Sequence, residues 1–475
     1  MLDTPLHWQP IEVLSKHIHD GSLSPVALME HFLDRAEAMN EALGAFQLLP
    51  REQALEAAHA SELALASGTD AGPLHGIPFA AKDIIDVRGL PTTAGSNGLL
   101  GNIAEQDATV VENLRRAGMV LMGKTRTVQF ALGAPGVNRI QGTPHNPWAK
   151  EHHVPGGSSS GSAVAVGAGL VPMALGTDTG GSVRVPASLC GTVGLKPTVS
   201  QVSRAGVFPL SDTLDSVGPL TLSVQGAAWV HQALHGVDPR DPMSLTANRQ
   251  DVLSGLVDGV SSLRIGIAEG LFIEDQDPEI TAAVEAAGEI LQGLGATVTR
   301  LPFPEAQRAL DANPRMRIST VEAALAHEQR LPGFNGYDET VSFRLAEGRA
   351  VSAVDYLRAR RDSAALSAEV DQGLRDIDVF ISSTTPSVAR PLTEVDANDD
   401  SYKYWNTRYS RNTVIGNLLG LCGVSVPCGF SPRGLPIGLM IHAKARDEAM
   451  ALRAALAFEA ATEWHKQRPD LSFCE

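Results

Sequence analysis

Two glycine-serine loops, separated by one short run of small residues, constrain this chain more than any other feature. The first loop reads PGGSSSGS over residues 155–162, and the second reads GTDTGGSVR over residues 176–184. The small, apolar residues 162–175 predict a helix packed closely between neighbours, followed by a buried strand at residues 173–175. Consecutive glycines let backbone N–H groups converge on one point and let another molecule approach the backbone. The segment therefore predicts a tightly packed core element with open, donor-rich turns beside it.

Composition and charge exclude several classes of protein. The chain has 475 residues, of which 43% are hydrophobic and 19% are charged, and its formal net charge is −16. It is long enough to bury a substantial core. The negative charge argues against a large binding surface for nucleic acid or an anionic membrane. The four cysteines, Cys190, Cys422, Cys428 and Cys474, fit neither a disulfide framework nor a zinc pattern, so we expect no metal and no cofactor.

No targeting or membrane-spanning segment is expected. Residues 1–10 lack a basic region followed by an apolar run, and no uninterrupted apolar stretch approaches the length of a membrane span. We therefore expect a cytoplasmic protein with no membrane partner.

The order of the predicted elements favours an α/β architecture with a mixed sheet. Residues 10–67 are predicted to be helical, with Ser24 as a helix cap and Pro25 at the first helical position. From residue 75 onward, short apolar runs punctuated by glycine and proline suit buried strands that alternate with helices. Strands are predicted at 77–79, 119–123, 263–267, 379–381 and 424–426, and helices at 108–117 and 280–294.

We expect a single domain over residues 1–475. It comprises N-terminal helices (1–70), a core that contains both loops (71–230), a more polar, helix-rich cap or insert on the same core (235–385), and a C-terminal part of the core (386–475).

The second loop has the elements of a serine acyl-transfer site. Ser182 follows Gly180 and Gly181, so its hydroxyl would lie beside N–H groups that can hold an oxyanion. Serine alone is a poor nucleophile and needs a base within hydrogen-bonding distance. If no histidine serves, Lys82 in its apolar surroundings is the available base.

Lys82 can act as a base only when it is neutral. Against a reference pKa of about 10.4, neutrality at pH 7 requires a shift of roughly 3.4 units, or about 4.6 kcal/mol. Full burial shifts a lysine by about 3–5 units, which is sufficient. Asp83 and Asp86 would oppose the shift if they faced the amine.

Two shorter motifs overlap the first loop. Residues 157–161 match the G-x-S-x-G nucleophile elbow at Ser159, but residues 152–155 before them are a poor strand. Residues 156–161 have the glycine spacing that opens a P-loop, but Ser162 stands where the phosphate-binding lysine belongs. Neither an α/β-hydrolase nor a nucleotide-binding loop is favoured.

Longer motifs, taken together, resemble the amidase signature family of serine hydrolases over nearly the whole chain. They are PLHGIP (73–78), the Lys82 segment, GKT (123–125), both glycine-serine loops, CGTVGLKP (190–197), DV to TP (378–386) and GLPIGL (434–439). The resemblance implies an amidase-signature fold, in which a mixed, twisted sheet is flanked by helices on both faces.

The resemblance also implies a Ser–Ser–Lys triad. Ser182 takes the place of the nucleophile, Ser158 that of the bridging serine with a cis peptide bond before it, and Lys82 that of the base. The resemblance assigns two further roles to the second loop. The backbone N–H groups of Thr179, Gly180, Gly181 and Ser182 would form the oxyanion hole, and Asp178 and Arg184 would brace the loop.

The chain departs from the family pattern near the expected substrate pocket. Ser160 stands where glycine is commoner, and Arg126, Val128 and Gln129 stand where many relatives have Asn, Met and Glu. That second stretch often borders the pocket, so we predict Arg126, Gln129 and Gly157 as pocket residues.

The function that the resemblance implies is cleavage of a small or medium carboxamide, through an acyl-enzyme, to a carboxylate and ammonia or an amine. A homodimer is expected from the same analogy. The alternatives are the glutaminase-type subunit of a tRNA-dependent amidotransferase, a ureido- or biuret-type amide hydrolase, and a non-catalytic scaffold. The amidotransferase subunit carries an acidic residue near the position of Ser410, where this chain has no carboxylate. Retention of Lys82, Ser158 and Ser182 together argues against the scaffold.

Overall fold

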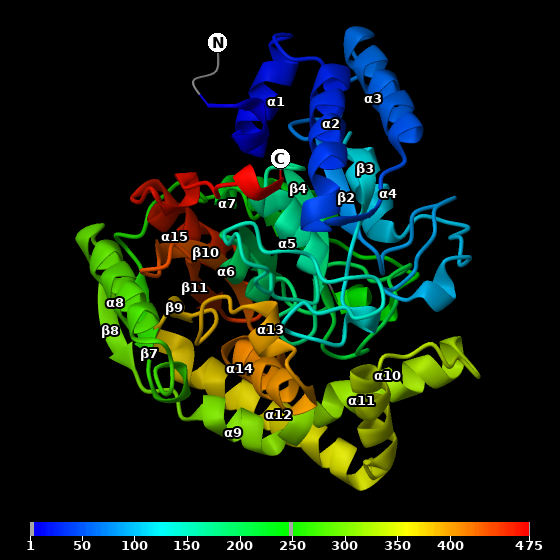
Figure 1. Ribbon diagram of the computed structural model, residues 1–475. Helices are drawn as coiled ribbons and strands as arrows, with labels where there is room; N and C mark the ends of the chain where they lie inside the picture. The colour runs from blue at the N-terminus through cyan, green and yellow to red at the C-terminus, as the bar shows by residue number, and fades with distance from the viewer. Residues whose placement is uncertain (1–3, 247–249, 475) are drawn as a thin grey trace.

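The core of the protein is one sheet of 11 strands, in the order β1-β3-β2-β4-β6-β5-β10-β11-β9-β7-β8 (Figure 1). The computed structural model describes residues 4–246 and 250–474. The strands are β1 (Phe46–Leu48), β2 (Pro78–Lys82), β3 (Val120–Thr125), β4 (Met173–Asp178), β5 (Val193–Lys196), β6 (Ser216–Thr221), β7 (Arg264–Ala268), β8 (Thr297–Leu301), β9 (Val379–Ser383), β10 (Cys422–Phe430) and β11 (Pro436–Ala443).

The sheet is mixed. Strand β2 is parallel to both β3 and β4, and β7 is parallel to both β8 and β9. Antiparallel pairs connect β4 through β6, β5, β10 and β11 to β9. The predicted α/β class with a mixed sheet is therefore confirmed.

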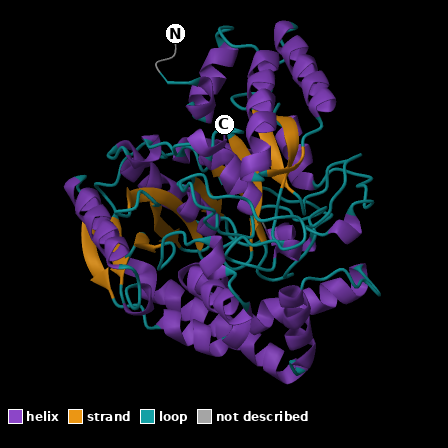
Figure 2. Ribbon diagram, viewed as in Figure 1, coloured by secondary structure: helices purple, strands orange, loops and turns teal. Residues whose placement is uncertain are grey.

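Helices cover both faces of the sheet (Figure 2). They are α1 (Ile11–His19), α2 (Pro25–Leu43), α3 (Arg51–Ala66), α4 (Thr109–Arg116), α5 (Ser160–Gly167), α6 (Arg184–Cys190), α7 (Val224–Leu234), α8 (Pro278–Gly293), α9 (Glu305–Ala312), α10 (Arg317–Arg330), α11 (Glu339–Ala350), α12 (Ala353–Gly373), α13 (Leu392–Val395), α14 (Asp399–Leu418) and α15 (Glu448–Ala460). Strand β9 illustrates the two layers, because side chains alternate between the faces of a strand. Val379 and Ile381 pack with α7, α8 and α15, whereas Phe380 packs with α9, α12 and α14.

The N-terminal helices α1, α2 and α3 lie together at one end of the molecule (Figure 1). As predicted, Ser24 caps α2: its Oγ accepts hydrogen bonds from the N–H groups of Val26 (3.1 Å) and Ala27 (3.2 Å). The helical prediction for residues 10–67 missed β1, which pairs with β3 at the edge of the sheet. A three-residue strand between two helices has too short a pattern to be recognised.

Helix α5 is the packed element that the small residues predicted. All eight of its residues are buried, and β4 follows it at the predicted position. A Cβ on Gly161 would lie 2.3 Å from the carbonyl oxygen of Ala45 and 2.5 Å from the backbone nitrogen of Arg126. Glycine is therefore needed for the close approach that holds the first loop against β3.

Residues 235–385 contain helices α8 to α12, in keeping with their helix-rich pattern, but they also add β7, β8 and β9 to the sheet. The predicted strands at 263–267 and 379–381 and the helix at 280–294 fall in this segment as β7, β9 and α8. The segment thus extends the sheet at one edge as well as adding helices. Its division from the rest of the domain stays a prediction.

Within residues 4–246 and 250–474, no helix is both long and apolar enough to cross a membrane. The same residues contain no cluster of three or more His, Cys, Asp or Glu side chains that could hold a metal ion. The four cysteines are free thiols. The cytoplasmic location stays a prediction, and residues 1–3 of the segment on which it partly rests lie outside the described residues.

Candidate active site

Lys82 is the last residue of β2 and is completely buried. Its Nζ donates hydrogen bonds to Ser158 Oγ and to Thr177 Oγ1, each at 2.8 Å. Thr177 belongs to β4, the parallel neighbour of β2. Two adjacent strands thus direct the amine and one of its hydroxyl partners to the same point.

The pKa of Lys82 is lowered to about 7 because burial disfavours the ammonium form, and the carboxylates of Asp215 and Asp178 offset this only in part. At neutral pH a large fraction of the amine is therefore unprotonated. Asp83, the next residue in the chain, does not oppose the shift, because it pairs instead with Lys124 (Nζ to Oδ1, 2.7 Å).

Ser158 is buried, and the Gly157–Ser158 peptide bond is cis, as the resemblance implied. Its carbonyl oxygen accepts hydrogen bonds from Thr127 Oγ1 (3.0 Å) and from the N–H of Val128 (3.2 Å). These bonds hold the backbone of Ser158 while its hydroxyl faces Lys82.

The neighbouring Ser159 has a structural position. Its N–H donates to the carbonyl of Ser182 (3.2 Å), which joins the two glycine-serine loops. Its Oγ accepts a hydrogen bond from the N–H of Thr177 (3.2 Å) and lies 3.3 Å from the Thr177 carbonyl oxygen. Ser162 donates to the carbonyl of Leu175 (3.0 Å) from within α5. Both hydroxyls thus bind β4, and neither contacts Lys82.

Asp178 organises the second loop from the end of β4. Its carboxylate accepts hydrogen bonds from the N–H groups of Gly181 (2.8 Å) and Val183 (3.1 Å). Arg184 adds a two-pronged ion pair, with Nε and Nη2 each 2.9 Å from a carboxylate oxygen. Burial alone would raise the pKa of Asp178, but the Arg184 guanidinium holds it well below its usual range. The loop is thus tied to a buried, ionised carboxylate.

Two residues of α14 complete this support, and sequence reasoning missed both. Asn417 Nδ2 donates to Asp178 Oδ1 (2.9 Å), and Thr413 Oγ1 donates to the carbonyl of Gly180 (2.8 Å). Gly181 has a φ of +127°, and a Cβ there would lie 2.0 Å from Thr413 Oγ1. Glycine is therefore required at this position. No local motif links α14 to the loop, since the two are more than 230 residues apart.

Ser182 is half-buried and opens onto a cavity of about 570 Å³. Thr179 and Gly180 of the same loop also line it, and helix α14 forms one long side. The remaining lining residues come from residues 131–134, Leu210, the α9 to α11 region and α14: Ala131, Leu132, Gly133, Ala134, Leu210, Leu310, Asn313, Met316, Ser319, Thr320, Thr340, Phe343, Arg344, Glu347, Tyr402, Lys403, Asn406, Thr407, Ser410, Arg411, Val414 and Leu418.

The three residues predicted for the pocket do not line this cavity. Gln129 is buried and holds the loop before α11: its Nε2 donates to the carbonyl of Gly336 (2.8 Å), and its Oε1 accepts from the N–H of Asp338 (2.7 Å). Arg126 lies against the first loop, where its backbone packs on Gly161. Gly157 packs on the backbone of residues 133–136. The cavity wall instead comes from helices far along the chain.

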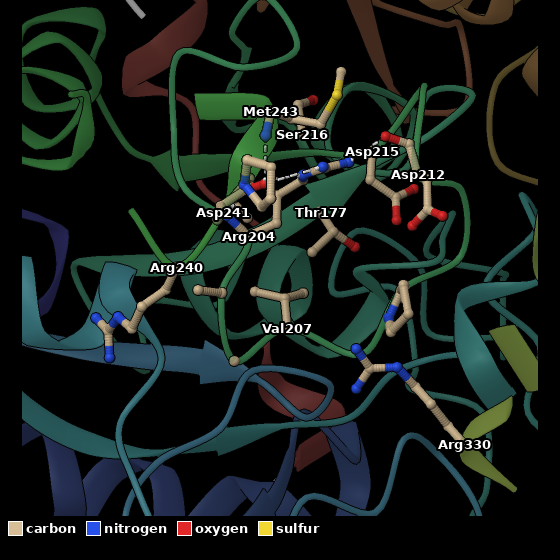
Figure 3. Close-up of a pocket in the computed structure, with 15 residues that line it drawn as sticks. Thr177, Arg204, Val207, Asp212, Asp215, Ser216, Arg240, Asp241, Met243 and Arg330 are labelled. Carbon is tan, nitrogen blue, oxygen red and sulfur yellow. Dashed lines mark hydrogen bonds and ion pairs between the residues drawn. The ribbon is translucent and has the colours of Figure 1, made fainter. Parts of the chain in front are cut away.

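Figure 3 shows a second cavity, of about 520 Å³. Thr177, whose hydroxyl accepts the Lys82 hydrogen bond, is one of its lining residues, as are Asp215 and Arg204. The carboxylate of Asp215 accepts a hydrogen bond from Thr179 Oγ1 (2.5 Å), and burial raises its pKa. Arg204 is held by Asp241, to which Figure 3 shows it joined. Thr177 therefore contacts both Lys82 and this cavity.

Comparison with known proteins identifies the family. The family model described as Amidase matches residues 27–452. The chain is 37% identical to the A subunit of the glutamyl-tRNA(Gln) amidotransferase of Chloroflexus aggregans, with 99% of each chain covered. It is 36% identical to the corresponding protein of Gloeobacter violaceus, over 97% of this chain and 98% of that one. The chain therefore belongs to the amidase signature family, as its motifs indicated.

Solved structures with the same fold include enzymes with different named substrates. The 6-aminohexanoate cyclic dimer hydrolase matches with a TM-score of 0.89 at 27% identity, over 99% of this chain and all of that one. The peptide amidase of Stenotrophomonas maltophilia matches with a TM-score of 0.82 at 30% identity, with coverage of 99% and 100%. A third match is described as a vestigial protein complex that reveals the origins of an s-triazine catabolic enzyme. Its TM-score is 0.87 at 31% identity, over 95% of this chain and 98% of that one. The amidase-signature fold is confirmed.

Proposed function

We propose that this protein is an amidase that hydrolyses the carbon–nitrogen bond of a small or medium carboxamide through a Ser182–Ser158–Lys82 triad. One observation carries the proposal: a fully buried amine with a pKa of about 7 lies 2.8 Å from a serine hydroxyl, in the loop bonded to Ser182. Buried lysines are rare unless paired with a charge, and among the residues that the structure describes this one donates to two hydroxyls and forms no ion pair.

The proposed mechanism proceeds by two proton transfers that accompany one bond formation. Neutral Lys82 takes the proton of the Ser158 hydroxyl as that hydroxyl takes the proton of Ser182, whose oxygen attacks the amide carbonyl. The N–H groups of the second loop, at Thr179, Gly180, Gly181 and Ser182, hold the oxyanion. The proton returns through Ser158 to the leaving nitrogen, which departs as ammonia or an amine. Water then hydrolyses the acyl-enzyme by the same route.

A second candidate is the glutaminase component of a tRNA-dependent amidotransferase, which the 36–37% identity to such proteins favours. Ser410, near which the resemblance places an acidic residue in that component, lines the cavity here and has a hydroxyl that donates to the carbonyl of Asn406 (2.8 Å). We therefore favour an amidase that acts without partner subunits, as the homodimer that the resemblance implies. Light scattering of the purified chain measures its oligomeric state.

A fluorophosphonate probe tests the function without knowledge of the substrate. We expect covalent labelling of the purified protein at Ser182, located by mass spectrometry, and release of ammonia from members of a carboxamide panel. Ser182→Ala should abolish both. Labelling at another serine, or none in a folded protein, would contradict the proposed nucleophile. Ammonia release that requires added partner subunits would favour the second candidate.

A further inference from the structure

The cavity beside Ser182 is positively charged in an acidic protein. The chain has a formal net charge of −16. The lining of the cavity nevertheless includes three cations, Arg344, Lys403 and Arg411, and a single carboxylate, that of Glu347. Glu347 already has an interaction partner. Apart from these side chains, much of the wall is apolar, formed by residues such as Leu310 and Val414. The site therefore favours a ligand with an apolar body and an anionic group.

Arg411 is a lining cation with a buried donor that has no partner. Its Nε donates to Asn412 Oδ1 (3.1 Å), and its Nη1 makes a long hydrogen bond to the carbonyl of Asp275 (3.4 Å). Nη2 is shielded from solvent and has no partner, and no carboxylate in residues 4–246 and 250–474 forms an ion pair with this side chain. The Asp275 carboxylate pairs instead with Arg408 (2.7 Å). The carboxylates of Asp275 and Glu274 lie near enough to act on Arg411 electrostatically, but neither is in ion-pair contact with it. A partly buried guanidinium in this state can still bind an anionic group of a ligand.

A second unpartnered donor lies on the same cavity. Asn313, at the end of α9, is only 4% exposed, and its Oδ1 accepts a hydrogen bond from the N–H of Ile318 (2.9 Å). Its Nδ2 has no partner. Helix α9 packs against α14, on which Arg411 lies. Two buried donors without acceptors on one cavity call for an acceptor group from the ligand.

The position of Arg411 relative to the second loop determines how far the anionic group of a ligand can lie from the amide held at Ser182. A Cβ built on Gly180 would lie 3.7 Å from Val414 Cγ2, so Val414 lies beside the loop that carries Ser182. Arg411 precedes Val414 by three residues on α14, which corresponds to about 4.5 Å along the helix axis. A flexible arginine in this position can meet a group a few bonds from an amide carbonyl held at Ser182.

We propose that Arg411, aided by Asn313, binds a carboxylate on the substrate, so that the preferred substrates are amides whose acyl chain ends in a carboxylate. The proposal rests on the proposed amidase function and narrows its substrate class to monoamides of dicarboxylic acids and similar acidic amides. The same positive charge repels an ammonium group, which sets this cavity apart from one built for the ammonium of glutamine.

The test uses fluorophosphonate labelling of Ser182 as a reporter of cavity occupancy, so it does not require turnover. Glutaramate, adipamate and glutarate are compared with the neutral pentanamide as ligands that slow labelling. For the wild type, we expect the carboxylate ligands to protect at concentrations about 10- to 100-fold lower than the neutral amide, as a charge-assisted hydrogen bond provides. Arg411→Gln should remove that advantage, and Arg411→Lys should restore part of it.

Arg308→Gln is the matched control, because it removes one arginine from α9, which also borders the cavity, at a position that does not line it and that pairs with Glu369. It should keep the preference for carboxylates. Equal protection by pentanamide and glutaramate in the wild type, or an equal loss for both ligands in Arg411→Gln, would overturn the assignment. Absence of any labelling at Ser182 would instead overturn the proposed function, so the two failures are distinguishable.

Discussion

Two fully buried lysines on neighbouring parallel strands, Lys82 on β2 and Lys124 on β3, have different surroundings. Lys124 Nζ lies 2.7 Å from the carboxylate of Asp83 and also donates to the carbonyl of Pro91 (3.0 Å). Lys82 Nζ donates hydrogen bonds to two hydroxyls, those of Ser158 and Thr177. A carboxylate favours the ammonium form, whereas hydroxyls leave burial to favour the neutral amine. Burial alone therefore does not make a lysine a base; the groups that the buried amine contacts matter as well.

Replacement of Lys82 gives the largest expected effect. Lys82→Met removes the base but keeps the volume of the side chain, so we expect kcat/KM to fall by more than about 10³-fold. The melting temperature should be no lower than that of the wild type, because methionine has no charge to desolvate. Ammonia release and thermal unfolding, measured on the same preparation, check both parts. A variant with wild-type activity would contradict the base assignment.

The matched change at Lys124 should have the opposite effect: a large loss of stability and little loss of activity. Lys124→Met leaves the Asp83 carboxylate buried without its cation, which should reduce the free energy of unfolding by about 3–5 kcal/mol. The kcat per folded molecule should remain near that of the wild type, since the Lys124 amine pairs with Asp83 rather than with the side chain of a residue of the proposed triad. Urea denaturation gives the stability, and labelling of Ser182 counts the folded sites. A large loss of kcat in a variant as stable as the wild type would show that Lys124 takes part in catalysis, contrary to this prediction.

The pH dependence of stability reports on the protonation of Lys82. The pKa of Lys82 is about 7 in the folded protein, below the unfolded value of about 10.4, so between these pH values the unfolded chain binds the additional proton. The contribution of Lys82 to stability therefore rises with pH across this window. Relative to Lys82→Met, the wild type should gain about 2–3 kcal/mol between pH 7 and pH 9. Urea denaturation of both proteins at the two pH values measures this difference; a constant difference would mean that the lysine keeps its proton in the fold.

Ser159 should give the smallest effect, although it lies next to the proposed bridging serine. Ser159→Ala removes hydrogen bonds to the backbone of Thr177, so we expect a loss of about 1–2 kcal/mol in stability. The kcat should stay within about tenfold of the wild type, because the hydroxyl does not contact Lys82. Loss of activity as complete as that in Ser158→Ala would show that the two serines had been assigned in the wrong order.

Local patterns were sufficient for much of the fold, and the resemblance to a family supplied the residues of the proposed triad. The run of small residues predicted α5 and β4, and the motifs singled out Lys82 and Ser158, whose side chains the fold brings into contact. Such predictions succeed because the residue types themselves are constrained: Gly161 and Gly181 have no room for a side chain. Short apolar runs likewise predicted β9, which is buried on both faces.

The substrate wall was not predictable in the same way. It is assembled from α9 to α11 and α14, whose inward residues recur at ordinary helical spacing and carry no motif. Gln129 shows the difficulty, because a position expected in the pocket turns its amide to backbone groups of residues 336 and 338. Asn417 and Thr413 support the second loop across more than 230 residues, a relation that only tertiary packing defines.

The rate of fluorophosphonate labelling of Ser182 as a function of pH tests the neutral-lysine relay most directly. Below pH 7 the rate should rise about tenfold per pH unit, bend near pH 7 and level off above it, because labelling follows the fraction of unprotonated Lys82. In Lys82→Met the remaining slow rate should lack this bend. A wild-type rate that does not change between pH 5 and pH 9, or a bend that survives in Lys82→Met, would contradict the account.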